Sequence, residues 1–195
     1  GMPVKMRYHA HGKGYSDLSF LIPELIERID YRKGPYFAGE GDFSSAGSAR
    51  MRLADRLPTG IASLTAGSNG YRRMLLADSV QAGQGTILYG LEGGRNKGPW
   101  DTPENVRKAN AMLRYQQGPH DDGYTVTAMA YRNRWNATDQ IPRRAVDNGT
   151  LGRFAGIDAS DGGQASRYSL SYAMRKRGAA GLLEIDAYAI ASTLD

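Results

Sequence analysis

The sequence lacks cysteine altogether and contains only three histidines in 195 residues. Without cysteine, a disulfide framework, thiolate metal ligands and a cysteine nucleophile are all excluded. His9 and His11 lie two residues apart, so they face the same side of an extended chain, with Asp17 nearby. No third or fourth ligand follows at a spacing typical of a metal site, so we expect neither a metal nor a cofactor.

The signatures of common enzymes are also missing. The sequence has no Gly-x-Ser-x-Gly nucleophile elbow and no His-Glu-x-x-His zinc motif. The carboxylates of Asp121, Asp122, Asp158 and Asp161 lie in glycine-rich contexts, where aspartate usually forms turns. We therefore expect that the chain is not an enzyme.

Long apolar runs and blocks of like charge are absent too. No run approaches the ~18 residues of a membrane helix, whereas alternating membrane strands remain possible. Lys and Arg outnumber Asp and Glu by 25 to 20, but no block of about five like charges occurs, which argues against nucleic acid. The scattered arginines predict a solvated basic face or, alternatively, an anionic partner, either a ligand or a lipid headgroup.

What the sequence has instead is alternation. Apolar and polar residues alternate along segments of about ten residues, which is typical of half-buried strands, and no window shows the helical spacing of apolar residues. In one segment Tyr168, Leu170, Tyr172 and Met174 oppose Ser169, Ser171, Ala173 and Arg175. The expected fold is all-β, an antiparallel meander of about seven long strands. We expect them at 57–67, 70–79, 85–95, 106–117, 123–135, 165–177 and 180–192.

The expected connections are unequal. Every second connection is short, whereas two of the remaining three, 96–105 and 136–163, are long. Tight turns at one end and long loops at the other are typical of outer-membrane barrels, and a soluble sandwich has no strong reason for this asymmetry. The alternation also places small or polar residues, including Asn110, Ser169, Ser171 and Glu184, on one face.

One motif precedes the strands: IPELIERIDYRKGP, residues 22–35. It predicts a helical turn at 23–26, a half-buried strand at 27–31 and a stop at Gly34-Pro35. Residues 36–50 are rich in glycine and small residues, which predicts a loop. The motif resembles the end of the plug domain in TonB-dependent outer-membrane receptors, where a similar Ile-Pro-x-x-x-Ile-Glu-Arg-Ile run leads into a Gly-Pro turn. The hairpin at Gly67-Ser68-Asn69-Gly70-Tyr71 is similar to the first barrel hairpin of that family.

This resemblance implies a plug-like part at 1–53 and the first barrel strands at 54–195. It implies a receptor in the outer membrane of a Gram-negative bacterium, taking up a scarce ligand such as an iron–siderophore complex. The implied partners are that small molecule, outer-membrane lipid and an inner-membrane energy-coupling protein. The implied ligand contacts are His9, His11, Lys13 and Tyr15 in a plug loop, and Trp100 and Trp135 at the rims of external loops.

The family's complete barrel has about 22 strands and an N-terminal coupling segment. We therefore expect this chain to be a fragment or truncated member that does not transport by itself. The alternative is a soluble β-barrel or sandwich that binds an apolar or anionic ligand, in which the apolar faces of the strands should point inward.

Overall fold

The computed structural model describes residues 2–4, 16–40, 44–179 and 181–195, and its fold is all-β, as the sequence predicts. A two-stranded sheet contains β1 (Ile26–Lys33) and β2 (Gly47–Leu53). The seven-stranded sheet contains β3 (Ile61–Ala66), β4 (Arg72–Ala82), β5 (Gly85–Asn96), β6 (Val106–Gln117), β7 (Gly123–Asn136), β8 (Gly162–Gly178) and β9 (Gly181–Leu194). The short helices are η1 (Pro23–Leu25), η2 (Ala38–Glu40) and α1 (Arg143–Asp147).

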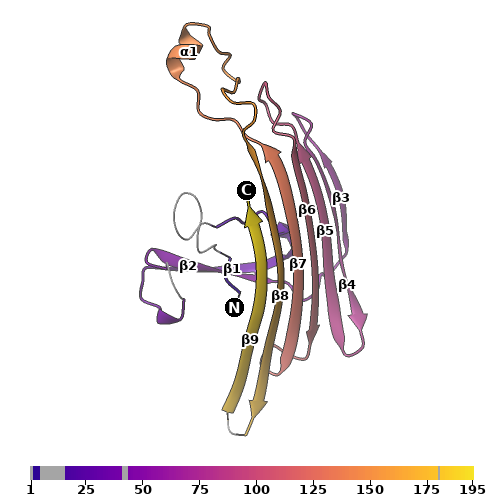
Figure 1. Cartoon of the computed structure of the whole chain (residues 1–195). Coiled ribbons are helices and arrows are strands. Elements are labelled where there is room, and N and C mark those ends of the chain that lie inside the picture. The colour runs from indigo at the N-terminus through magenta and orange to yellow at the C-terminus, as the bar shows by residue number, and fades with distance from the viewer. Residues whose placement is uncertain (1, 5–15, 41–43, 180) are drawn as a thin grey trace.

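The seven-stranded sheet is a meander in which each strand pairs with the next strand in sequence, always antiparallel. Short turns at 83–84 and 118–122 lie at one end of the sheet, where β8 ends at Gly178 and β9 begins at Gly181. The connections 67–71, 97–105 and 137–161 lie at the other end, and the last of them carries α1 (Figure 1). We call these the short-turn end and the long-connection end. The predicted asymmetry of the connections is confirmed.

The sheet is bowed, and the N-terminal part of the chain lies on its concave side (Figure 1). Residues 20–25 pack against the middle of that face. Leu25 lies against Gly90 of β5. Among the described residues, Leu25, Leu75 of β4 and Leu88 of β5 are the largest fully buried side chains. The remaining buried apolar residues belong to the same cluster, so the hydrophobic core is the contact between residues 20–25 and the concave face.

The predicted alternation is confirmed in side-chain exposure. On β6, Asn110 and Met112 are buried on the concave face, whereas Leu113 is 53% exposed on the other. On β8, Ser169 is buried while Leu170 is 54% exposed. The face that points to the N-terminal segment is therefore the more polar one, and many large apolar side chains point away from it.

Two predictions for the N-terminal part are wrong. The strand at 27–31 is not half-buried, because Ile29 is 56% and Tyr31 is 71% exposed. Strands β1 and β2 pair with each other, and their residues Ile26, Met51 and Leu53 pack against the core. The rest of the two strands projects from the concave side, away from the large sheet (Figure 1). Residues 47–50, predicted as loop, form the start of β2.

Backbone pairing and ion pairs override the loop propensity of residues 47–50. Gly47 pairs with Lys33 and Arg50 pairs with Asp30 in the ladder between β1 and β2. The Glu40 side chain, 6% exposed, lies 3.3 Å from Arg32 Nη1 and 2.9 Å from Arg50 Nε. This carboxylate therefore links the two strands, a long-range contact that local composition does not reveal.

Candidate functional site

Trp100, one of the predicted ligand contacts, lies in the connection 97–105. Its indole Nε1 donates a hydrogen bond to Glu104 Oε1 at 2.8 Å. Its ring meets Phe154 of the next long connection edge-on, with the centroids 6.0 Å apart. The backbone N–H of Asp101 also donates to the Phe154 carbonyl at 3.0 Å. The connections 97–105 and 137–161 therefore pack against each other around Trp100.

Trp135, the other predicted tryptophan, lies near the end of β7 on the concave face. It is partly buried and packs against the core cluster. Gly163 of β8 lies directly opposite, and a Cβ at that position would come within 2.7 Å of the indole ring. A glycine here makes room for the ring. The two tryptophans thus lie at the same end of the sheet, in different surroundings.

The other four predicted contacts, His9, His11, Lys13 and Tyr15, lie outside the described residues. The described stretch that follows them, 16–25, runs along the concave face. It is held there by the apolar core and by polar side chains of the large sheet, which the sequence predictions did not single out.

The main polar contact is centred on Glu92 of β5, whose side chain is 1% exposed. Glu92 accepts hydrogen bonds from Arg73 Nε at 2.7 Å and Asn110 Nδ2 at 2.8 Å, and Lys108 Nζ lies 3.1 Å away. Arg73 also donates to both carboxylate oxygens of Glu24 in η1, at 2.6 and 2.8 Å. We call these five residues the Glu92 cluster. It joins three strands of the sheet to the N-terminal segment.

The charges of the Glu92 cluster stabilise one another. The buried Glu92 carboxylate lies between two cations, Arg73 and Lys108, which favour its ionised form. The hydrogen bond from Arg73 lowers the pKa of Glu24 in η1. Asn110 Nδ2 also donates to the Ser19 carbonyl at 2.9 Å. Both carboxylates are therefore ionised at neutral pH, and the cluster contains two cations and two anions.

A second polar contact holds the segment that follows β2. Arg114 of β6 donates to Asp55 Oδ1 from Nη2 at 2.7 Å and to Thr127 Oγ1 from Nη1 at 3.0 Å. Nε2 of His120, in the turn between β6 and β7, lies 3.1 Å from Asp55 Oδ2. Residues 54–60 are therefore tied to the concave face near the short-turn end.

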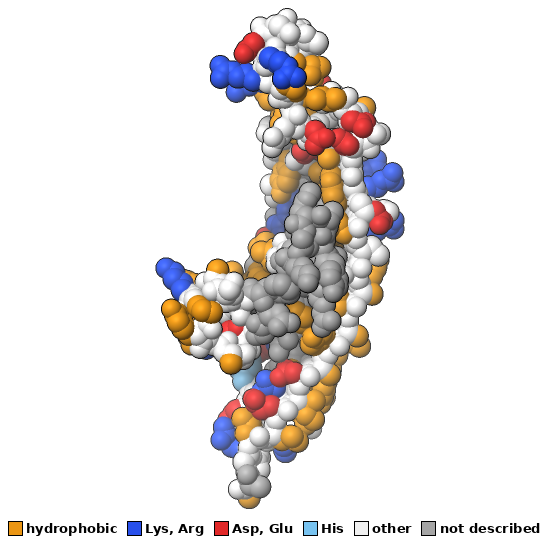
Figure 2. Space-filling view, turned by 60° about the vertical axis from the view of Figure 1, so that its left-hand side comes forward, with side chains coloured by type: hydrophobic (Ala, Val, Ile, Leu, Met, Phe, Trp, Pro, Cys, Tyr) orange, Lys and Arg blue, Asp and Glu red, His pale blue; other side chains and the backbone are white. Residues whose placement is uncertain are grey.

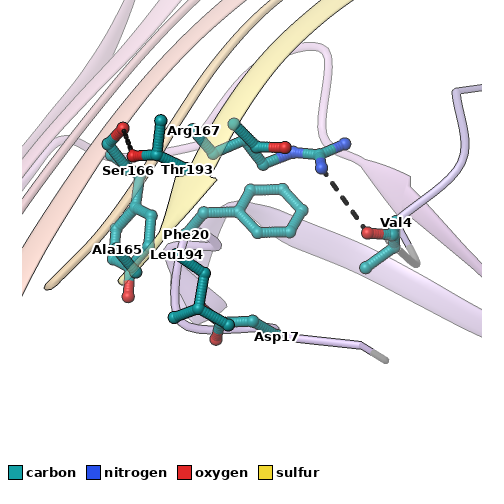
Figure 3. A pocket seen from close by; sticks show the side chains of 10 residues that line it. Val4, Asp17, Phe20, Ala165, Ser166, Arg167, Thr193 and Leu194 are labelled. Atoms are coloured by element: carbon teal, nitrogen blue, oxygen red, sulfur yellow. Dashed lines mark hydrogen bonds between the residues drawn. The ribbon is translucent and has the colours of Figure 1, made fainter. Parts of the chain in front are cut away.

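A third contact surrounds Arg167 of β8, which is 7% exposed (Figure 3). Its guanidinium lies 4.7 Å from the centre of the Phe20 ring, and its Nη2 donates to the Pro3 carbonyl at 2.8 Å. Asp17, Phe20 and Tyr131 line the cavity beside this guanidinium. The adjoining cavity measures about 20 Å³, which is room for one water and not for a chelate ligand.

The outer, convex face is built differently. Residues that lie directly opposite one another across the ladders form three rows that we call the convex band. These are Leu76, Leu91, Ala111, Ala130, Tyr168 and Ala191; Asp78, Tyr89, Leu113, Ala128, Leu170 and Ala189; and Val80, Ile87, Tyr115, Val126, Tyr172 and Ala187. Asp78 is the single charged member. Leu91 and Leu113 are 49% and 53% exposed, so the band is an open apolar surface.

Several classes of site find no support in the described part of the chain. It contains no group of three His, Asp or Glu side chains arranged to hold a metal ion. Asp158 accepts hydrogen bonds from the backbone N–H and hydroxyl of Ser160, as the sequence predicts for a turn-forming aspartate. Among the same residues no helix is both long and apolar enough to cross a membrane.

Comparison with known proteins yields no relative. No family model, curated protein or solved structure matches the chain.

Proposed function

We propose that this chain is part of an outer-membrane receptor of the TonB-dependent type. In such a receptor the seven strands are a portion of the barrel wall and the segment before them is the end of the plug. The receptor takes up a scarce ligand such as an iron–siderophore complex, with energy supplied through an inner-membrane coupling protein. The long-connection end, where Trp100 and Trp135 lie, is then the side that meets the ligand.

The observation that carries this proposal is the distribution of polarity between the two faces of the sheet. A soluble sandwich or closed soluble barrel buries its apolar face and exposes its polar one. Here the concave face carries the Glu92 cluster and Arg114, whereas the convex band carries leucines that are about half exposed. A polar lumen and an apolar exterior are what a membrane barrel requires.

The height of the apolar surface supports the same interpretation. On β6 the outward side chains from Ala109 to Tyr115 are apolar, bounded by Arg107 and Gln117. About ten residues of strand separate those boundaries, or about 34 Å. A tilt of about 40° reduces this to about 26 Å, close to the ~25 Å apolar band of outer-membrane barrels.

Aromatic side chains form the edge of the convex band at the short-turn end. Tyr115 and Tyr124 lie with ring centroids 5.8 Å apart, and Tyr124 and Tyr172 lie 6.3 Å apart. The hydroxyls of Tyr115 and Tyr124 both reach Gln117 Oε1, at 2.8 and 3.1 Å. Rings next to an apolar surface with hydrogen-bonded polar tips are typical of a membrane interface.

The alternative, a soluble binding module for an apolar or anionic ligand, needs a site inside the sheet. The cavity beside Arg167 measures about 20 Å³ and is too small for such a ligand. The apolar surface is on the convex face instead, where a soluble monomer would expose it to water.

Vesicle flotation tests the proposal with two arginine substitutions on opposite faces. Leu170 points outward in the middle row of the convex band and is 54% exposed, and Tyr188 on the concave face of β9 is 52% exposed. An arginine near the centre of the lipid-facing band costs about 2–4 kcal/mol. Leu170→Arg should therefore lower partitioning into phosphatidylcholine vesicles about 30- to 700-fold, and Tyr188→Arg should leave it nearly unchanged. Equal effects of the two variants, or a wild-type chain that stays with the aqueous phase, would contradict the proposal.

A further inference from the structure

Four arginines lie side by side across the convex face at the long-connection end. The ladders pair Arg72 with Arg95, Arg95 with Arg107, and Arg107 with Arg134, so they form one row across β4, β5, β6 and β7. All four side chains are exposed. Neighbouring strands are about 4.8 Å apart, so the row spans about 14 Å. We call it the arginine row.

The arginine row has no acidic partner in the described part of the chain. Other strand arginines do have one: Arg73 pairs with Glu24 and Glu92, and Arg175 pairs with Glu184 at 2.6 Å. Like charges directly opposite each other across a ladder destabilise a sheet. The row therefore does not stabilise the fold, and an external anion that bridges neighbouring guanidiniums would remove the repulsion.

The other end of the sheet shows no such excess of positive charge. At the short-turn end Lys176 on the convex face lies 3.2 Å from Asp122, and Arg177 on the concave side of β8 lies 3.3 Å from Asp121. The basic side chains there are neutralised by neighbouring carboxylates. The unpaired basic row is thus confined to one end of the sheet. This indicates that an anionic layer meets the apolar band on that side.

The position of the row relates it to the convex band. Figure 2 shows Lys and Arg side chains on the convex side toward the long-connection end, and hydrophobic side chains further along that side. Arg132 lies two residues before Arg134 on the convex face of β7, between the arginine row and the convex band. It borders a surface hollow that is also lined by Gln164, Ser166, Tyr168 and Thr193. The Ser166 and Thr193 hydroxyls hydrogen-bond each other across it at 2.8 Å. The hollow thus combines a guanidinium and hydroxyls with the edge of the apolar surface.

We propose that the arginine row and the adjoining Arg132 hollow bind the phosphate groups of lipid headgroups that carry a net negative charge. This inference rests on the proposed function for the orientation of the convex band toward lipid. Guanidinium presents a planar fork of N–H donors that matches phosphate oxygens, so two neighbouring arginines can share one phosphate. Arginine stems also lie along apolar surface while their charged ends stay in the headgroup layer. A soluble anion would have no need of the apolar surface beside the row.

The test compares vesicles of phosphatidylcholine alone with vesicles that also contain phosphatidic acid. The variant is Arg95→Gln combined with Arg107→Gln, which removes the two central guanidiniums. The matched control is Arg144→Gln combined with Arg153→Gln, two exposed arginines of the connection 137–161, with the same loss of charge. Each arginine near an anionic surface contributes about fivefold to binding, so the row variant should lose about 30-fold of the preference for phosphatidic acid.

The expected result is that the control keeps the preference and that both double variants bind phosphatidylcholine vesicles as the wild type does. The inference is overturned if the row variant keeps the preference, or if the control loses as much. It is also overturned if inorganic phosphate at low concentration displaces the chain from the mixed vesicles, because the row would then bind soluble phosphate. A wild-type chain that binds only vesicles with phosphatidic acid would contradict the proposed membrane insertion while supporting the headgroup site. A chain that binds neither vesicle would overturn both.

Discussion

Replacing Glu92 by glutamine tests whether the Glu92 cluster holds the N-terminal segment on the sheet. The Glu92 side chain is 1% exposed, and its carboxylate accepts hydrogen bonds from Arg73 Nε at 2.7 Å and Asn110 Nδ2 at 2.8 Å. Lys108 Nζ lies 3.1 Å from the same carboxylate. Glutamine keeps the shape and one acceptor but removes the charge. Arg73 and Lys108, whose side chains are 18% and 25% exposed, would then lose their shared counter-ion.

The cost follows from the burial of each partner. Removing one member of a fully buried ion pair costs about 3–5 kcal/mol. Arg73 keeps Glu24 as a partner and glutamine still accepts a hydrogen bond, so we expect Glu92→Gln to cost about 2 kcal/mol. Glu24 contacts the same arginine but is 33% exposed, and partly exposed pairs contribute about 1 kcal/mol or less. Glu24→Gln is therefore the matched control, with less than half the effect.

The dependence on pH has a defined sign. The pKa of Glu24 in the fold lies below its ordinary value of about 4.5 because Arg73 donates hydrogen bonds to it, so the folded state binds this proton more weakly than the unfolded state does. Its contribution is fully present above about pH 4.5 and is lost as the pH falls through the lowered pKa. Wild-type stability should fall in that range, and Glu24→Gln should show a shallower decline.

Urea unfolding of the chain in detergent micelles, followed by circular dichroism at several pH values, measures both effects. The reasoning fails if Glu24→Gln destabilises as much as Glu92→Gln. It also fails if Glu92→Gln unfolds at the same urea concentration as wild type at neutral pH. In the second case the apolar contacts of residues 20–25 alone would hold the segment in place.

Two further predictions concern the core and the ligand end. At Gly90 of β5 a Cβ would lie 2.5 Å from Leu25 Cδ1, and Leu25 is fully buried, so Gly90→Ala should lower the urea midpoint by the equivalent of about 1–3 kcal/mol. Gly93→Ala on the same strand meets nothing within 4 Å and should have little effect; equal effects would show that Leu25 can move. Trp100→Phe removes the hydrogen bond to Glu104 and should weaken binding of a ferric siderophore about fivefold in a fluorescence titration, with Trp135 as the remaining reporter. Unchanged affinity would remove Trp100 from the ligand site.

Most of the large sheet could be predicted from the sequence because alternation and turn signals are local. The alternation along 106–117 correctly predicts where β6 begins and ends and which side chains share each face. Asn110, for example, is buried on the face predicted to be polar. The 3₁₀ turn at Pro23–Leu25 and the end of β1 at Lys33 are also confirmed, since proline and glycine act on the backbone nearby.

What the sequence does not reveal is which elements cover one another. The alternation from Glu27 to Tyr31 is real, but its apolar side chains stay exposed because β1 pairs only with β2. The Glu92 cluster brings together residues from η1, β4, β5 and β6, and none of them is unusual within its own segment. A charged residue at an inward position of an alternating strand, such as Glu92, is the one local signal that such a cluster leaves.

The arginine row shows the same dependence on pairing. Arg72, Arg95, Arg107 and Arg134 are scattered in sequence, and their alignment depends on the register of three ladders. A shift of one residue in any ladder would move an arginine to the other face, because side chains alternate with a period of two. The core fixes this register independently of the arginines, since Leu75, Leu88 and Met112 must all point to the concave face. The same pairing that buries the core therefore assembles the row, and substitutions in the row should change lipid preference without changing the fold.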